Sequence, residues 1–184
     1  PGVELGKFAI RSGPFFAASD FIEAIISGKG GHAAKPHETI DPTVIASQIV
    51  VALQTIASRR SDPVEQVVVS ITSFETSSTA FNVIPQEVKI KGTVRTLDPD
   101  VRDLAEKEFL RITELTAEAM GGSADAKFTR GYPVMSNSSE QTEFAAKVAR
   151  DVAGECAEAP LVMGGEDFAY MLEERPGAYI LLGN

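Results

Sequence analysis

Apolar residues recur on one face in three segments of the chain and β-branched residues fill a fourth, which predicts four β-strands. In residues 87–96 the apolar side chains fall on one face, and Lys89, Lys91 and Arg95 fall on the other. Such alternation is typical of a strand that buries one face only. The four predicted strands are residues 21–28, 67–74, 87–96 and 124–132.

Two segments with helical spacing lie between these strands. Each begins with an Asp-Pro pair, Asp41-Pro42 and Asp98-Pro99, in which Asp caps the helix and Pro fits its first turn. The first helix is predicted to extend to about Ser58, and the second to end at Gly121-Gly122. The resulting order β-α-β-β-α-β predicts an α+β, ferredoxin-like unit with an antiparallel sheet, two helices on one face and the other face open.

The flanking residues have a different pattern. Residues 1–18 are predicted to form a hairpin of two short strands around a turn, and residues 139–154 a helix. Further short elements are predicted at residues 161–163, 166–173 and 178–182. This βα alternation belongs to a larger sheet than these residues can build. We therefore expect a domain of residues 19–134 inserted into a partial α/β domain formed by residues 1–18 and 135–184.

The charge of the chain excludes one class of function. The formal net charge is -9, whereas nucleic-acid binding needs clustered Lys and Arg. No apolar run approaches the ~18 residues of a membrane span, so no membrane partner is expected. The only cysteine, Cys156, cannot form an internal disulfide, which fits a cytoplasmic protein. We expect Cys156 to be structural rather than catalytic.

Both histidines of the chain lie in one Gly- and Ala-rich segment, residues 28–37. Histidine titrates near neutral pH and is therefore a candidate acid, base or ligand. The small residues around His32 leave its imidazole uncovered. The spacing of His32 and His37, without a further His or Cys ligand, does not favour a metal site. Two solvated loop histidines remain the alternative interpretation.

Three further features could bind a substrate, although each also has a purely structural explanation. Asn82 begins the turn-like sequence Asn-Val-Ile-Pro. Arg95, on the polar face of its strand, could bind a carboxylate with its guanidinium fork or simply be solvated. Gly165 and Glu166 belong to a Gly-Gly-Glu-Asp sequence before a short helix, where backbone N–H groups can hold an anion.

Taken together, the motifs resemble one enzyme family. Along the chain they are residues 30–37, Asp41-Pro42, residues 82–85, residues 92–96 and residues 163–170. In this order they are similar to the dinuclear-zinc amidohydrolases and peptidases of the aminoacylase and carboxypeptidase type. The branch with hippurate hydrolases, N-acetyl-diaminopimelate deacetylases and auxin-conjugate hydrolases is the most similar. The resemblance implies that residues 19–134 are the lid and dimerisation domain of a homodimeric enzyme, and that the flanking segments belong to its catalytic domain.

The resemblance also implies roles for individual residues. His32 would reach the active site of the partner subunit as a catalytic residue that polarises the scissile carbonyl. Asn82 and Arg95 would bind the substrate, an N-acyl amino acid or similar small amide. The loop with Gly165 and Glu166 would close the pocket on the side of the catalytic domain.

The metal ligands of that family are missing from this sequence. They include a Cys-Gly-His-Asp-type segment, a Glu-Glu pair and further histidines, and this sequence has no Cys-Gly-His-Asp segment and no histidine besides His32 and His37. The resemblance therefore implies two zinc or other divalent ions in a parent protein, none bound by this chain, and a fragment that is inactive alone. Two alternatives stay open: a non-catalytic dimerisation module, and a regulatory domain that binds a small molecule.

Overall fold

The computed structural model describes residues 2–184 and divides into two compact units. The larger unit comprises Asp20–Arg95 and Asp100–Arg130. The smaller unit comprises the residues before Asp20, the segment Thr96–Pro99 and the segment Gly131–Asn184. No helix within residues 2–184 is long and apolar enough to cross a lipid bilayer.

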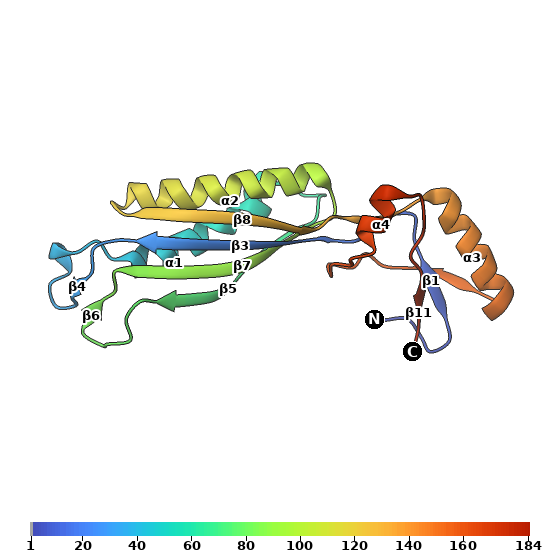
Figure 1. Cartoon of the computed structure of the whole chain (residues 1–184), viewed down its shortest axis with the longest axis horizontal. Helices are drawn as coiled ribbons and strands as arrows, with labels where there is room; N and C mark the ends of the chain where they lie inside the picture. Colours follow the sequence, from blue (N-terminus) through green and yellow to red (C-terminus); the bar gives the residue numbers. More distant parts are fainter. Residues whose placement is uncertain (1) are drawn as a thin grey trace. The chain divides into compact units, whose positions relative to one another are not determined.

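The larger unit is a four-stranded sheet covered by two helices (Figure 1). Its strands follow one another in the sheet in the order β5-β7-β3-β8, so the first strand of the unit lies next to the third. The elements along the chain are β3 (Ala18–Ser27), α1 (Pro42–Leu53), β5 (Val67–Thr76), β7 (Glu87–Thr96), α2 (Pro99–Ala119) and β8 (Ser123–Tyr132). This order of elements agrees with the β-α-β-β-α-β pattern expected from the sequence.

The helices begin where the Asp-Pro pairs predict. The Asp41 carboxylate accepts a hydrogen bond from the Thr43 amide at 2.8 Å, which satisfies a donor in the first turn of α1. The first helix is shorter than predicted, because α1 ends at Leu53 and a π-helical turn, Ile56–Arg60, follows it. The apolar spacing continues through Ile56, which is fully buried, and therefore does not reveal the change of helix type.

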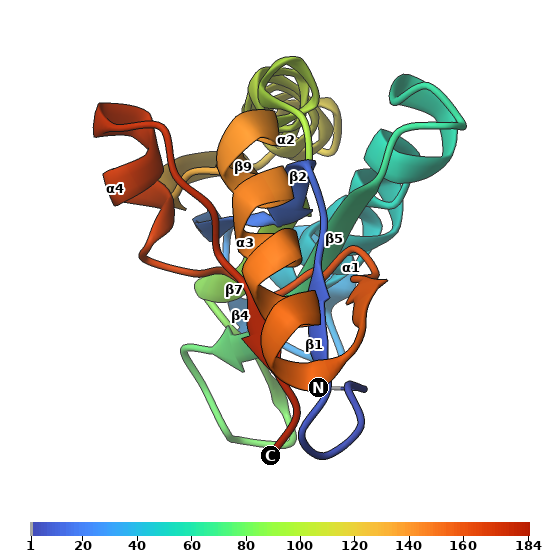
Figure 2. The same ribbon diagram turned by 90° about the vertical axis from the view of Figure 1, so that its right-hand side faces the viewer.

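The core of the larger unit lies between the sheet and the two helices. Alternate strand residues such as Ile26 and Ile90 pack in one cluster with Ile49 of α1 and Phe109 of α2. Because both helices contribute to this cluster, they cover the same face of the sheet. Figure 2 shows α1 and α2 from a second side. On the other face, the side chain of Phe21 is 57% exposed.

The smaller unit contains two small sheets. In the first, β1 (Phe8–Ile10) lies between β10 (Cys156–Glu158), which is parallel to it, and β11 (Leu181–Leu182), which is antiparallel. In the second, β2 (Gly13–Phe16) pairs with β9 (Met135–Asn137). The helices of this unit are α3 (Ser139–Ala153) and α4 (Ala169–Glu174).

Three details of the smaller unit differ from the prediction. The two N-terminal strands do not pair with each other, because each is taken up by a different sheet. The strand predicted at residues 161–163 is only a bridge between Val162 and Phe16, and Pro160, which has no N–H, precedes it. The strand β10 was not predicted, because its three residues are too few to show a periodic pattern.

Candidate active-site elements

His32 lies in a short two-stranded ribbon at one end of the larger unit (Figure 1). The ribbon consists of β4 (Gly31–His32) and β6 (Val83–Ile84), paired antiparallel with His32 opposite Val83. The Ala33 amide extends the pairing by donating to the Asn82 carbonyl oxygen at 3.0 Å. Two motifs that are far apart in the sequence therefore meet, and the ribbon brings His32 and Asn82 to the same place.

Gln86 ties the base of this ribbon together. Its side-chain amide donates to the Gly28 carbonyl oxygen at 2.8 Å, and its side-chain oxygen accepts from the Gly30 amide at 3.0 Å. At Gly30 a Cβ atom would lie only 2.8 Å from the Ile84 carbonyl oxygen, so only glycine allows this close approach. The sequence interpretation missed Gln86, whose only signal is its position directly after Pro85.

The imidazole of His32 is exposed and has a defined tautomer. Its Nδ1 accepts a hydrogen bond from the Ala34 amide at 3.1 Å. A nitrogen that accepts has no proton, so the neutral ring carries its proton on Nε2. An exposed Nε2–H group can donate a hydrogen bond to the oxyanion that develops when an amide carbonyl is attacked.

An aromatic side chain stands beside Asn82. Phe81 is fully exposed, and Val83 of the ribbon is 44% exposed. Asn82 itself is also exposed. The ribbon thus presents a donor imidazole, an amide and apolar surface together, a combination suited to contact with another molecule. Phe81 did not stand out in the sequence, because one aromatic residue in a polar connector has no periodic context.

Arg95 lies near the far end of the sheet from the ribbon. It is the penultimate residue of the ten-residue strand β7, which begins just after the ribbon strand β6. At ~3.3 Å per residue, β7 is about 30 Å long. One copy of the larger unit therefore does not bring His32 and Arg95 together.

Gly165 and Glu166 lie in a loop of the smaller unit that leads into α4. A Cβ atom on Gly165 would lie 2.6 Å from the Ser19 Cβ atom, so this position requires glycine. The Glu166 carboxylate accepts hydrogen bonds from the Phe168 amide at 3.4 Å and from the Tyr179 hydroxyl at 3.3 Å. The loop therefore holds a carboxylate in a defined orientation.

The other candidate ligands and nucleophiles do not form a centre. His37 lies in the 3-10 turn Pro36–Glu38, with its Nε2 atom 3.7 Å from the Glu38 carboxylate. Among residues 2–184, no group of three or more His, Cys, Asp or Glu side chains is placed to hold a metal ion. These residues therefore do not fit a dinuclear metal centre. Burial raises the pKa of the Cys156 thiol, which makes it a weaker nucleophile at neutral pH.

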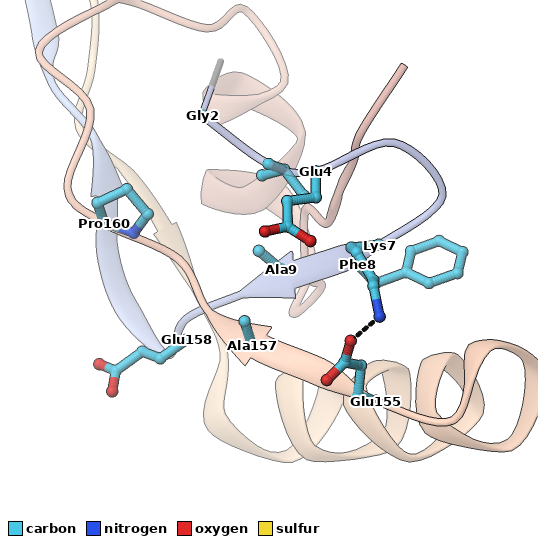
Figure 3. A pocket seen from close by; sticks show the side chains of 10 residues that line it. Gly2, Glu4, Lys7, Phe8, Ala9, Glu155, Ala157, Glu158 and Pro160 are labelled. Carbon is cyan, nitrogen blue, oxygen red and sulfur yellow. Dashed lines mark hydrogen bonds and ion pairs between the residues drawn. The ribbon is translucent and has the colours of Figure 1, made fainter.

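A separate hollow of about 370 Å³ lies in the smaller unit (Figure 3). The Lys7 ammonium and the Glu155 carboxylate form an ion pair at its wall, and Glu4 and Glu158 also line it. None of the predicted site residues lines this hollow. A partly exposed ion pair of this kind contributes little to stability.

Residues 17–119 match the peptidase dimerisation domain of the M20 type. The chain belongs to this family.

Curated relatives match nearly the whole chain. Thermostable carboxypeptidase 2 of Saccharolobus solfataricus is 38% identical over 179 residues, which cover 97% of this chain and 45% of that protein. N-acetyl-L-cysteine deacetylase of Bacillus subtilis is 37% identical over 183 residues, which cover 100% of this chain and 44% of that protein. The IAA-amino acid hydrolase ILR1-like 2 of Arabidopsis thaliana is 40% identical over 187 residues, which cover 98% of this chain and 42% of that protein. The chain thus spans less than half the length of these relatives.

A solved structure supports the same assignment. The Bacillus subtilis YXEP protein, described as a dinuclear metal binding peptidase from the M20 family, superposes with a TM-score of 0.81 at 30% identity. The match covers 100% of this chain and 45% of that one. The relatives are peptidases, deacetylases and amidohydrolases, as the motifs in the sequence indicated.

Proposed function

We propose that this chain is the lid and dimerisation portion of a metal-dependent amidohydrolase that hydrolyses N-acyl amino acids or similar small amides. Residues 19–134 are the lid, and residues 1–18 and 135–184 are segments of the catalytic domain. The observation that carries the proposal is the exposed Nε2–H group of His32 in a ribbon shared with Asn82. The metal ions, zinc or another divalent metal, are held by residues outside this chain, in a cytoplasmic enzyme.

The two edge strands of the sheet support a homodimer that forms through one of them. The sheet order leaves β5 and β8 at the edges. Strand β5 carries one charged residue, Glu75, close to its end, whereas β8 carries Asp125, Lys127 and Arg130. An edge with few charges invites pairing with another strand, and charges protect an edge against it. We therefore place the dimer contact at β5, antiparallel to β5 of the partner.

This pairing explains how two distant residues can serve one site. Antiparallel pairing about a twofold axis sets the ribbon end of one sheet beside the Arg95 end of the other. His32 of one subunit then completes the site to which Arg95 of its partner belongs. Within a single subunit the length of β7, about 30 Å, separates the two residues.

Each residue then has a defined task. The Nε2–H group of His32 donates to the carbonyl oxygen of the scissile amide and to the oxyanion that replaces it. The Arg95 guanidinium binds the free carboxylate of the substrate through two parallel hydrogen bonds. The Asn82 amide orients the substrate from the ribbon, and the loop with Gly165 and Glu166 also binds the substrate.

The test is a hydrolysis assay on the full-length, metal-loaded protein with a panel of N-acetyl amino acids, combined with sedimentation velocity. We expect amide hydrolysis by a dimer, and no hydrolysis by residues 1–184 alone. A full-length dimer that hydrolyses none of these amides would support the non-catalytic dimerisation module instead. Binding of free amino acids without preference for the N-acyl form would support a regulatory domain.

A further inference from the structure

We propose that Tyr179 is a positioning residue that orients the Glu166 carboxylate in the substrate loop, and that Asn137 holds Tyr179 in place. This inference rests on the proposed function where it concerns catalysis. The arrangement itself lies entirely within the smaller unit.

The Asn137 side chain binds both the amide and the carbonyl oxygen of Tyr179 and so fixes its backbone. The Asn137 side chain is buried, and its Nδ2 donates to the Tyr179 carbonyl oxygen at 2.9 Å. Its Oδ1 accepts from the Tyr179 amide at 2.7 Å. A further bond from Nδ2 to the Arg11 carbonyl oxygen, also 2.9 Å long, anchors the amide at the end of the β2–β9 pair. Because all these donors and acceptors are partly or fully buried, breaking one of these hydrogen bonds costs free energy of folding.

The ring of Tyr179 is held by three other aromatic rings. Phe15, Phe16 and Phe168 lie with centroids 6.4, 5.5 and 5.7 Å from it, in edge-on or tilted arrangements. Such contacts favour one ring orientation. The hydroxyl group at the end of this fixed ring therefore points to one place, and it lies 3.3 Å from the Glu166 carboxylate.

The direction of this hydrogen bond is set by the ionisation of the phenol. Burial, and then the negative charge of Glu166, raise the pKa of Tyr179. The hydroxyl group therefore keeps its proton at neutral pH and remains a donor. Glu166 thus accepts from two donors, the phenol and the Phe168 amide, and its carboxylate stays beside Gly165 in one orientation.

Hydrogen exchange tests the arrangement in this chain without any assay of activity. Tyr179→Phe keeps the ring and removes the hydroxyl group, and we expect the Phe168 amide to exchange about fivefold faster, the factor for losing one hydrogen bond. Tyr170→Phe is the matched control, because the Tyr170 hydroxyl donates over the same 3.3 Å to the Gly131 carbonyl oxygen instead. Equal effects of the two variants on Phe168, or no effect of either, would overturn the inference.

A double-mutant cycle in the full-length enzyme tests the catalytic consequence. We expect Tyr179→Phe to lower kcat/KM about tenfold when Glu166 is present and less than twofold in a Glu166→Ala background, since partners in one network are not additive. A tenfold loss in both backgrounds would show that Tyr179 acts on general structure and would refute the positioning role. A wild-type protein that hydrolyses no N-acyl amino acid would refute the proposed function, while the exchange experiment would still decide the role of Tyr179.

Discussion

The Ala33 amide donates to the Asn82 carbonyl oxygen at 3.0 Å, and this bond helps to link the histidine loop to the connector before β7. The pairing of His32 with Val83 continues it into a ribbon. Through this ribbon His32 and Asn82, which were predicted on separate segments, become neighbours. Because the contacts are between backbone groups, side chains at the tip can be changed without removing them.

Replacing His32 should therefore affect catalysis rather than folding. In the full-length enzyme we expect His32→Ala to lower kcat by ~10² or more, the scale of losing one oxyanion donor. His37→Ala is the control, because His37 is equally a loop histidine but lies outside the ribbon. Activity of His32→Ala within a few-fold of the wild type would contradict the role of its imidazole.

Replacing Gln86 should loosen the ribbon at its base. Gln86→Ala removes the bonds to Gly28 and Gly30, each worth about 1 kcal/mol, and we expect the amides of residues 28–32 to exchange roughly thirtyfold faster. Gln48→Ala, at an exposed position of α1, should leave these amides unchanged. Hydrogen exchange measured by NMR would show the difference. Unchanged protection of these amides in Gln86→Ala would contradict the claim that the Gln86 side chain holds the base of the ribbon together.

The choice of dimer edge can be tested with one lysine on each edge strand. Thr72 of β5 and Thr129 of β8 are both exposed. Thr72→Lys should weaken dimerisation at least tenfold, because the twofold axis brings two like charges close together at the interface. Thr129→Lys should have no such effect. Sedimentation velocity over a concentration series measures both, and the opposite ranking would place the dimer at β8.

Acid should remove the stabilising effect of Glu108. The nearly buried Glu108 carboxylate accepts a hydrogen bond from Arg111 at 2.7 Å and lies 3.3 Å from the Arg60 guanidinium. The bond from Arg111 lowers its pKa below the ordinary value of 4.5. The stabilisation is therefore present in full above pH 4.5 and lost as the pH falls through the lowered pKa.

Urea unfolding of the wild type and of Glu108→Gln measures this effect. The difference in the free energy of unfolding should be largest near neutral pH and should shrink as the solution is acidified below pH 4.5. A difference that does not change with pH would mean that the charge of Glu108 is not what stabilises this position.

The larger unit could be predicted from the sequence because its signals are local. The alternation in β7 and the Asp-Pro pairs fix strands and helix starts without reference to the rest of the chain. The ribbon could not be predicted, because β4 and β6 have two residues each and depend on Gln86 for their position. In the smaller unit, Asn137 and Tyr179 meet only through the tertiary fold, so no spacing in the sequence points to them.

The central claim is that His32 serves the active site of the other subunit, and subunit complementation tests it most directly. His32→Ala and Arg95→Ala versions of the full-length enzyme would be mixed after reversible dissociation and assayed at low concentrations of an N-acetyl amino acid. Arg95→Ala alone should raise KM, because the hydrogen bonds from the guanidinium to the substrate carboxylate are lost.

If His32 acts across the interface, a mixed dimer contains one site with both residues, and random mixing should restore about a quarter of the wild-type activity. If His32 acts within its own subunit, every site in the mixture lacks one of the two residues. Activity no higher than the average of the two variants would contradict the account.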